Sequence, residues 1–118
     1  MGLTTIRAEA ANPRLLKRRV VLDFLVDSGA TYSVIPAARL GELGVTPTGT
    51  RVLRLANGQL VERQIGEVRI SFQERSATCL VIFGKRGDAT LMGVTALENL
   101  GLAFDPMRQK IMPMPLLL

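Results

Sequence analysis

The segment 24–31 places a carboxylate directly after an apolar run and before a glycine. The run ends at Val26, Asp27 and Ser28 follow, and Gly29 comes next. A dense apolar run is typical of a buried β-strand, and Asp, Ser and Gly are common turn residues. A strand that ends in such a turn holds one carboxylate on a rigid support. Asp27 is therefore the leading candidate for a functional residue.

The residue types that are missing exclude several other chemistries. The 118 residues include no histidine and a single cysteine, Cys79. Ser-His-Asp and Cys-His nucleophile systems, zinc sites that use imidazole, and an internal disulfide are therefore excluded. We expect no cofactor and no metal, so any catalysis would depend on carboxylates, hydroxyls or basic residues. Cys79 itself is expected to be a small buried apolar residue.

Short strand-like runs between turns predict an all-β (mostly β) fold with one or two short helices. The length suits a single domain over residues 1–118. Seven or eight strands are expected, the strongest hairpin signal being Asn57-Gly58. The predicted extended runs are 3–10, 15–26, 33–35, 50–56, 59–72, 77–83, 102–105 and 109–112, and the predicted helices are 36–43 and 95–100. Residues 90–93 form a short apolar run that ends at a glycine.

The net charge of +5 raises the question of a nucleic-acid partner. Basic residues cluster near the start of the second predicted strand, at Arg14, Lys17, Arg18 and Arg19. A solvated hairpin end explains such a cluster equally well, and one tyrosine without tryptophan offers few stacking platforms. Nucleic-acid binding is therefore not expected. Because the N-terminus has no signal-peptide pattern and no run is long enough to span a membrane, we expect a soluble protein in the reducing cytoplasm.

One aspartate alone is a weak catalyst, but two at hydrogen-bonding distance share a proton. One then acts as base on a bound water while the other donates to the substrate carbonyl. Asp23 lies on the same strand, about 13 Å from Asp27, and Asp105 belongs to an Asp-Pro turn. Neither suits a pair with Asp27, so a second copy of the chain is the expected source of the second acid. The Asn57-Gly58 hairpin is a candidate lid.

Two motifs carry a resemblance to a known family. Residues 25–31 (LVDSGAT), with 34–36 (VIP) after them, resemble the active-site segment of retropepsin-like aspartic proteases. Residues 91–93 (LMG), followed by 97–102 and 104–106, are similar to the C-terminal segment of the bacterial and retroelement-derived members. The resemblance spans about residues 19–112.

This resemblance implies a closed β-barrel that forms a homodimer and hydrolyses peptide bonds as an aspartic endopeptidase. Each chain would contribute one catalytic Asp27, and the Ser28 hydroxyl would brace the two loops across the dimer axis. The implied supporting and substrate-binding residues are Gly29, Ala30 and Thr31 in the loop, Ala56, Asn57, Gly58 and Gln59 in the flap, and Leu91, Met92 and Gly93 behind the loop.

Some features depart from the family pattern or allow two interpretations. Viral members place Arg-Asp after the second glycine, where this chain has Val94-Thr95, so bracing within the monomer is expected to differ. Pro113 and Pro115 make the tail a poor interior strand. Glu98 is expected to be a solvated or capping carboxylate. Substrate pockets and core remain alternatives for Leu53, Leu55, Val81, Phe83 and Met92, with core favoured for Phe83. A non-proteolytic dimeric peptide-binding module is the alternative function.

Overall fold

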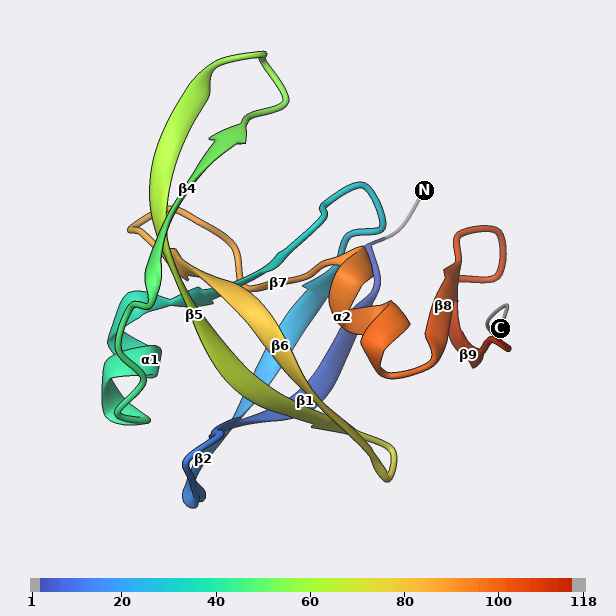
Figure 1. Cartoon of the computed structure of the whole chain (residues 1–118). Helices are drawn as coiled ribbons and strands as arrows, with labels where there is room; N and C mark the ends of the chain where they lie inside the picture. The colour runs from blue at the N-terminus through green and yellow to red at the C-terminus, as the bar shows by residue number, and fades with distance from the viewer. Residues whose placement is uncertain (1–2, 116–118) are drawn as a thin grey trace.

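The computed structural model describes residues 3–115, which form nine strands and two short helices (Figure 1). The elements are β1 (Thr5–Asn12), β2 (Leu15–Val26), β3 (Ser33–Pro36), α1 (Ala37–Glu42), β4 (Gly49–Arg54), β5 (Leu60–Phe72), β6 (Arg75–Gly84), β7 (Leu91–Met92), α2 (Val94–Asn99), β8 (Leu102–Asp105) and β9 (Lys110–Pro113). The all-β prediction is confirmed, although the strand count exceeds the seven or eight expected.

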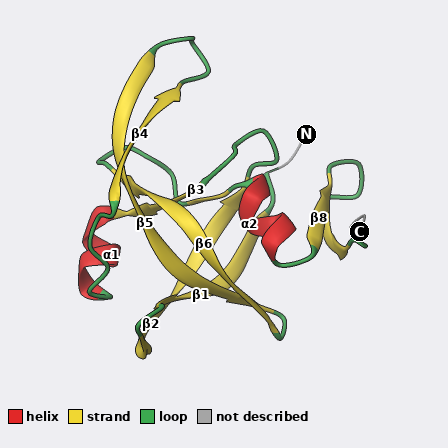
Figure 2. Ribbon diagram, viewed as in Figure 1, coloured by secondary structure: helices red, strands yellow, loops and turns green. Residues whose placement is uncertain are grey.

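The main sheet is closed. Its seven strands follow the order β1-β2-β7-β3-β6-β5-β4, and an additional antiparallel pairing joins β1 to β5 around Ala10 and Ile70. This pairing links six strands into a ring and leaves β4 attached to β5 alone. The closure joins the two ends of the sheet, while β2 pairs with β7 only at Leu25 and Val26 and keeps the rest of that edge unpaired. A separate two-stranded sheet, β8-β9, lies beside α2 (Figure 2).

The core fills the inside of this ring. Along β5 the buried side chains alternate, with Val68 and Ile70 inside and Glu67 exposed, as the sequence pattern predicts. Val81, Phe83 and Met92 are buried and belong to the core, whereas Leu53 is half-buried and Leu55 exposed. The largest fully buried side chains are Phe24, Ile35, Leu40, Ile70, Met92 and Leu97.

Most strand boundaries differ by one or two residues from those predicted. β1 continues to Asn12, and β4 ends at Arg54, so Leu55 and Ala56 lie in the hairpin loop. β6 begins at Arg75 because a tight turn needs only Gln73 and Glu74, whose φ angles are +48° and +65°. Such positive φ values are usually provided by glycine or asparagine, and the sequence has neither here.

The C-terminal strand β9 lies outside the ring. β9 contains Pro113 and lies at an edge, consistent with the prediction for the proline-broken tail. The last residues of the predicted tail, 116–118, lie outside the described residues. No helix within residues 3–115 is long and apolar enough to cross a membrane.

Candidate active site

Asp27 directly follows β2 and begins a tight turn. Its Oδ1 accepts a hydrogen bond of 2.9 Å from the Gly29 N–H, and its backbone carbonyl accepts one of 3.1 Å from Ala30. A Cβ on Gly29 would lie 3.3 Å from Asp27 Oδ1, so glycine allows the turn to approach the carboxylate closely. Asp27, Ser28 and Gly29 are all exposed in the single chain.

The second apolar element supports this turn from behind. β7 pairs in parallel with β2, with Leu25 opposite Leu91 and Val26 opposite Met92. Beyond the strand ends, the Asp27 N–H donates to the Met92 carbonyl at 3.1 Å. The two apolar runs that are halted by glycine thus lie side by side.

Backbone hydrogen bonds continue from β7 along the rest of the loop. Val94 N–H donates to the Ala30 carbonyl at 2.8 Å, and Thr95 N–H donates to the Thr31 carbonyl at 3.1 Å. These two residues stand where viral members of the resembling family have Arg-Asp. The loop is therefore held here by the main chain at the start of α2 rather than by a charged pair.

Gly93 allows this close contact. An added Cβ would come within 2.6 Å of the Tyr32 carbonyl carbon and oxygen and within 2.9 Å of the Thr31 carbonyl oxygen. The Gly93 N–H donates to Ser33 Oγ at 3.0 Å, and Ser33 is 1% exposed. Ser33 is the single buried polar residue among residues 3–115, and its hydroxyl joins the start of β3, directly after the Asp27 loop, to the residue that follows β7.

The predicted flap forms the end of a long hairpin. Figure 1 shows β4 and β5 extending together away from the ring. At the tip, Gly58 has φ +88°, its N–H donates to the Leu55 carbonyl at 2.8 Å, and Asn57 Oδ1 accepts from the Gln59 N–H at 2.9 Å. Within the described part of the chain, no hydrogen bond joins Ala56, Asn57, Gly58 or Gln59 to the Asp27 loop.

The hairpin instead contacts the loop lower down, through residues that the sequence analysis did not identify. Arg51 Nη1 donates to Tyr32 Oη at 2.7 Å, and the guanidinium carbon lies 5.7 Å from the centroid of the tyrosine ring. Tyr32 directly follows the 27–31 turn. Neither residue belongs to a recognisable motif, so only their spatial meeting reveals the contact.

The other aspartates that were considered are engaged elsewhere. Asp23 accepts a hydrogen bond of 3.0 Å from Arg7 Nε, on the neighbouring strand. Asp105 Oδ1 accepts from the Met107 and Arg108 N–H groups at 3.0 and 3.2 Å, which gives it the expected turn role. Within residues 3–115, no group of three or more His, Cys, Asp or Glu side chains is placed to hold a metal ion.

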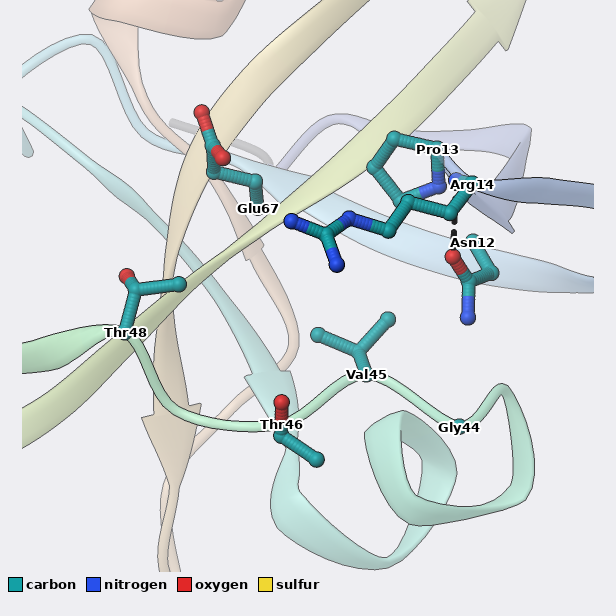
Figure 3. A pocket seen from close by; sticks show the side chains of 8 residues that line it. All are labelled: Asn12, Pro13, Arg14, Gly44, Val45, Thr46, Thr48 and Glu67. Carbon is teal, nitrogen blue, oxygen red and sulfur yellow. Dashed lines mark hydrogen bonds between the residues drawn. The ribbon is translucent and has the colours of Figure 1, made fainter.

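A separate pocket lies at the β1–β2 turn (Figure 3). It has a volume of about 220 Å³, and Figure 3 shows the Arg14 side chain pointing across it towards Glu67. Its lining residues are Asn12, Pro13, Arg14, Gly44, Val45, Thr46, Thr48 and Glu67. None of them belongs to the Asp27 turn, to β7 or to the hairpin tip. Cys79, which is 2% exposed, and Glu98, which is exposed, belong neither to this pocket nor to the Asp27 turn.

Comparisons with known proteins agree with this architecture. The family model described as aspartyl protease matches residues 16–104. A structure of EIAV protease in complex with an inhibitor is 22% identical, with a TM-score of 0.61, 85% of this chain and 89% of that chain being covered. A retropepsin-like aspartic protease from Rickettsia conorii is 21% identical, with a TM-score of 0.56 and coverage of 88% and 77% respectively. The search of curated proteins gave no significant match.

The match to the family model extends from β2 through α2 into β8 and includes both the Asp27 turn and β7, so this chain belongs to the aspartyl protease family, whose members are aspartic-type hydrolases.

Proposed function

We propose that the chain is an aspartic endopeptidase that is active as a homodimer, with Asp27 of each copy forming the catalytic pair. The observation that carries the proposal is the setting of Asp27: an exposed carboxylate on a turn that is braced by β7, with no hydrogen bond to another acid within residues 3–115. Asp23 is paired with Arg7, and Asp105 is held in its own turn. A second carboxylate must then come from a second chain.

The chemistry follows from the proximity of two carboxylates. When they lie at hydrogen-bonding distance, both cannot ionise, so the pair retains one proton over a range of pH. The ionised member removes a proton from a water, which attacks the peptide carbonyl. The protonated member donates to the carbonyl oxygen. Neither a covalent intermediate nor a residue type that this chain lacks is required.

The surrounding residues have roles that suit this mechanism. The turn fixes the carboxylate through the Gly29 N–H, and Ser28 is exposed beside it, available to a partner loop. The hairpin that ends in Ala56, Asn57, Gly58 and Gln59 would close over a bound peptide and exclude water from the carboxylates. The apolar face of an extended peptide would lie between this hairpin and the loop.

The decisive experiment compares three proteins on one peptide mixture. Wild type, Asp27→Asn and the control Asp23→Asn are incubated at several pH values with peptides from a digested, unrelated protein, and new termini are identified by mass spectrometry. We expect pepstatin-sensitive cleavage by wild type and Asp23→Asn, and none by Asp27→Asn, which keeps the fold and the dimer. Cleavage by Asp27→Asn would exclude this mechanism. A folded dimer of wild type that cuts nothing would instead favour the peptide-binding alternative.

A mixing experiment tests whether the two acids come from different chains. Wild type is titrated with an excess of Asp27→Asn at constant wild-type concentration and allowed to exchange subunits. If both copies must provide Asp27, mixed dimers are inactive and activity falls as the variant is added. Constant activity under exchange would mean that one chain is sufficient, which contradicts the proposed pair.

A further inference from the structure

We propose that Arg51, on the inner face of the hairpin, binds an acidic side chain of the substrate next to the peptide bond that is cut. The inference rests on the proposed function, because it takes the space between the hairpin and the Asp27 turn as the peptide site. It adds a substrate class to that function: peptides with glutamate or aspartate near the cleavage position.

The guanidinium of Arg51 contacts the residue that directly follows the Asp27 turn. Arg51 lies on β4, yet its Nη1 donates to the hydroxyl of Tyr32 at 2.7 Å, and Tyr32 follows directly on the 27–31 turn. Tyr32 is itself fixed, because the next residue, Ser33, is buried and bonded to Gly93. Arg51 therefore spans the base of the hairpin and the end of the active-site loop, at the edge of the space that a peptide would fill.

The register of the hairpin determines the face on which Arg51 lies. In the β4–β5 register, Arg51 is opposite Arg63 and Leu53 is opposite Val61, so the four side chains share one face. Leu53, Val61 and Arg63 are half-buried. The residues of the opposite face include Val52, Leu60 and Glu62, and all three are exposed. The face of Arg51 is thus turned towards the body of the protein, while Arg51 itself is exposed and its guanidinium lies against Tyr32.

Arg51 has a like charge directly opposite it on the neighbouring strand. Two arginines directly opposite each other on antiparallel strands destabilise a hairpin through repulsion. Arg63 has an acidic partner in Asp88, with Nη2 3.9 Å from Oδ1. Over residues 3–115, Arg51 takes part in no ion pair. Arg51 therefore faces this repulsion without a counter-ion of its own among the described residues, and its position suits a counter-ion supplied by a bound peptide.

The geometry of the group selects the class of ligand. A guanidinium has five N–H donors in a planar fork that matches the two oxygens of a carboxylate. The Tyr32 hydroxyl accepts from Nη1 and leaves the other donors of Arg51 available. Because the ring lies under the guanidinium at 5.7 Å, the side chain is also held in place before any peptide arrives. A carboxylate on the peptide is therefore the partner that fits.

The test uses the same peptide mixture with full-length wild type, Arg51→Gln, Arg51→Glu and the control Arg14→Gln, which changes an exposed arginine at the distant β1–β2 turn. Wild type and Arg14→Gln should cut preferentially beside Glu or Asp. Arg51→Gln should lose this preference, and Arg51→Glu should prefer Lys or Arg at the same position. For a matched pair of peptides that differ by Glu against Gln, Arg51→Gln should raise KM for the acidic peptide about tenfold, the value of one charge-assisted hydrogen bond.

The outcomes separate the two claims. If wild type cuts in an Asp27-dependent way but shows no acidic preference, or if Arg51→Gln keeps the preference while circular dichroism shows it folded, the inference is wrong and the proposed function stands. If wild type and Asp27→Asn are equally inactive, the proposed function fails and the substrate class fails with it. Tyr32→Phe, which keeps the ring and removes the hydroxyl, should weaken the preference less than Arg51→Gln does; a larger loss would assign the recognition to Tyr32 instead.

Discussion

Replacing Gly93 by alanine should have a large effect for so small a change. Gly93 has extended backbone angles, φ −87° and ψ 172°, which alanine adopts without strain. The obstacle is steric: the added Cβ would lie 2.6 Å from the Tyr32 carbonyl carbon and oxygen and 2.9 Å from the Thr31 carbonyl oxygen. These are main-chain atoms, so no side-chain rotation relieves the contact. β7 and the end of the active-site loop must move apart.

The magnitude can be worked out from the two interactions that this movement affects. Overpacking a well-packed interior costs about 1–3 kcal/mol. Separating Gly93 from the buried Ser33 weakens their 3.0 Å hydrogen bond, which is worth about 0.5–1.5 kcal/mol net. We therefore expect Gly93→Ala to lower the free energy of unfolding by about 2–4 kcal/mol. The free energy of unfolding of a small domain is about 5–15 kcal/mol, so this loss is a large part of the total. It corresponds to a fall in Tm of about 10 °C.

Urea titration measures the change in the free energy of unfolding, and thermal melting measures the change in Tm. All proteins are kept at one concentration because dimerisation would add to apparent stability. Gly41→Ala is the matched control. Gly41 lies within α1, and a Cβ there would meet no atom within 4 Å. Alanine favours a helix over glycine, so the control should be as stable as wild type or more stable by up to about 1 kcal/mol. If Gly93→Ala unfolds within about 0.5 kcal/mol of wild type, β7 does not pack against the loop as closely as the structure places it.

Two further predictions concern the carboxylate and the buried thiol. Gly29→Ala should move the Asp27 carboxylate by a few tenths of an ångström, because its Cβ would lie 3.3 Å from Oδ1; kcat should fall about tenfold or more while the urea midpoint changes little, and unchanged kcat would contradict the reasoning. Burial raises the pKa of Cys79 above its usual value, against smaller opposing effects of Asn99 and Arg69. Above the pKa of the unfolded thiol, the unfolded chain binds fewer protons than the folded one, so the free energy of unfolding should fall as pH rises through about 8.5. Cys79→Ala should lack this decrease, and equal slopes in urea titrations across that pH range would refute it.

The parts of the fold that the sequence predicts well are those specified by neighbouring residues. The bounds of β2 and β8 match the predicted runs, because alternation and turn residues are visible within a few positions. The Asn57-Gly58 hairpin was predictable for the same reason, since its loop places Gly58 at a positive φ that glycine tolerates. The turn at Asp27 likewise follows from residues 27–29 alone.

The parts that the sequence does not predict depend on distant segments meeting. The closure of the ring pairs Ala10 with Ile70, and nothing in either local pattern identifies the other. The same holds for Arg51 and Tyr32, which lie 19 residues apart in different elements and meet only in the folded chain. Gly93 has an extended conformation, so a turn analysis gives no reason for it. Only the neighbouring carbonyl of Tyr32 explains why a side chain is excluded there.

The arrangement of β2 and β7 explains why the proposed site needs two chains. The two strands run in parallel, in register, and a glycine follows the end of each, so the fold brings two similar positions together. Only the first carries an acid. The second contributes main-chain groups instead: the Met92 carbonyl accepts from Asp27, and the Val94 N–H donates to Ala30. One element thus presents the carboxylate and the other holds it still. A chain that uses its second element for support has no position left for a second acid at this point, so the proposed mechanism requires another copy, and a substitution that loosens β7 should impair both copies of the pair.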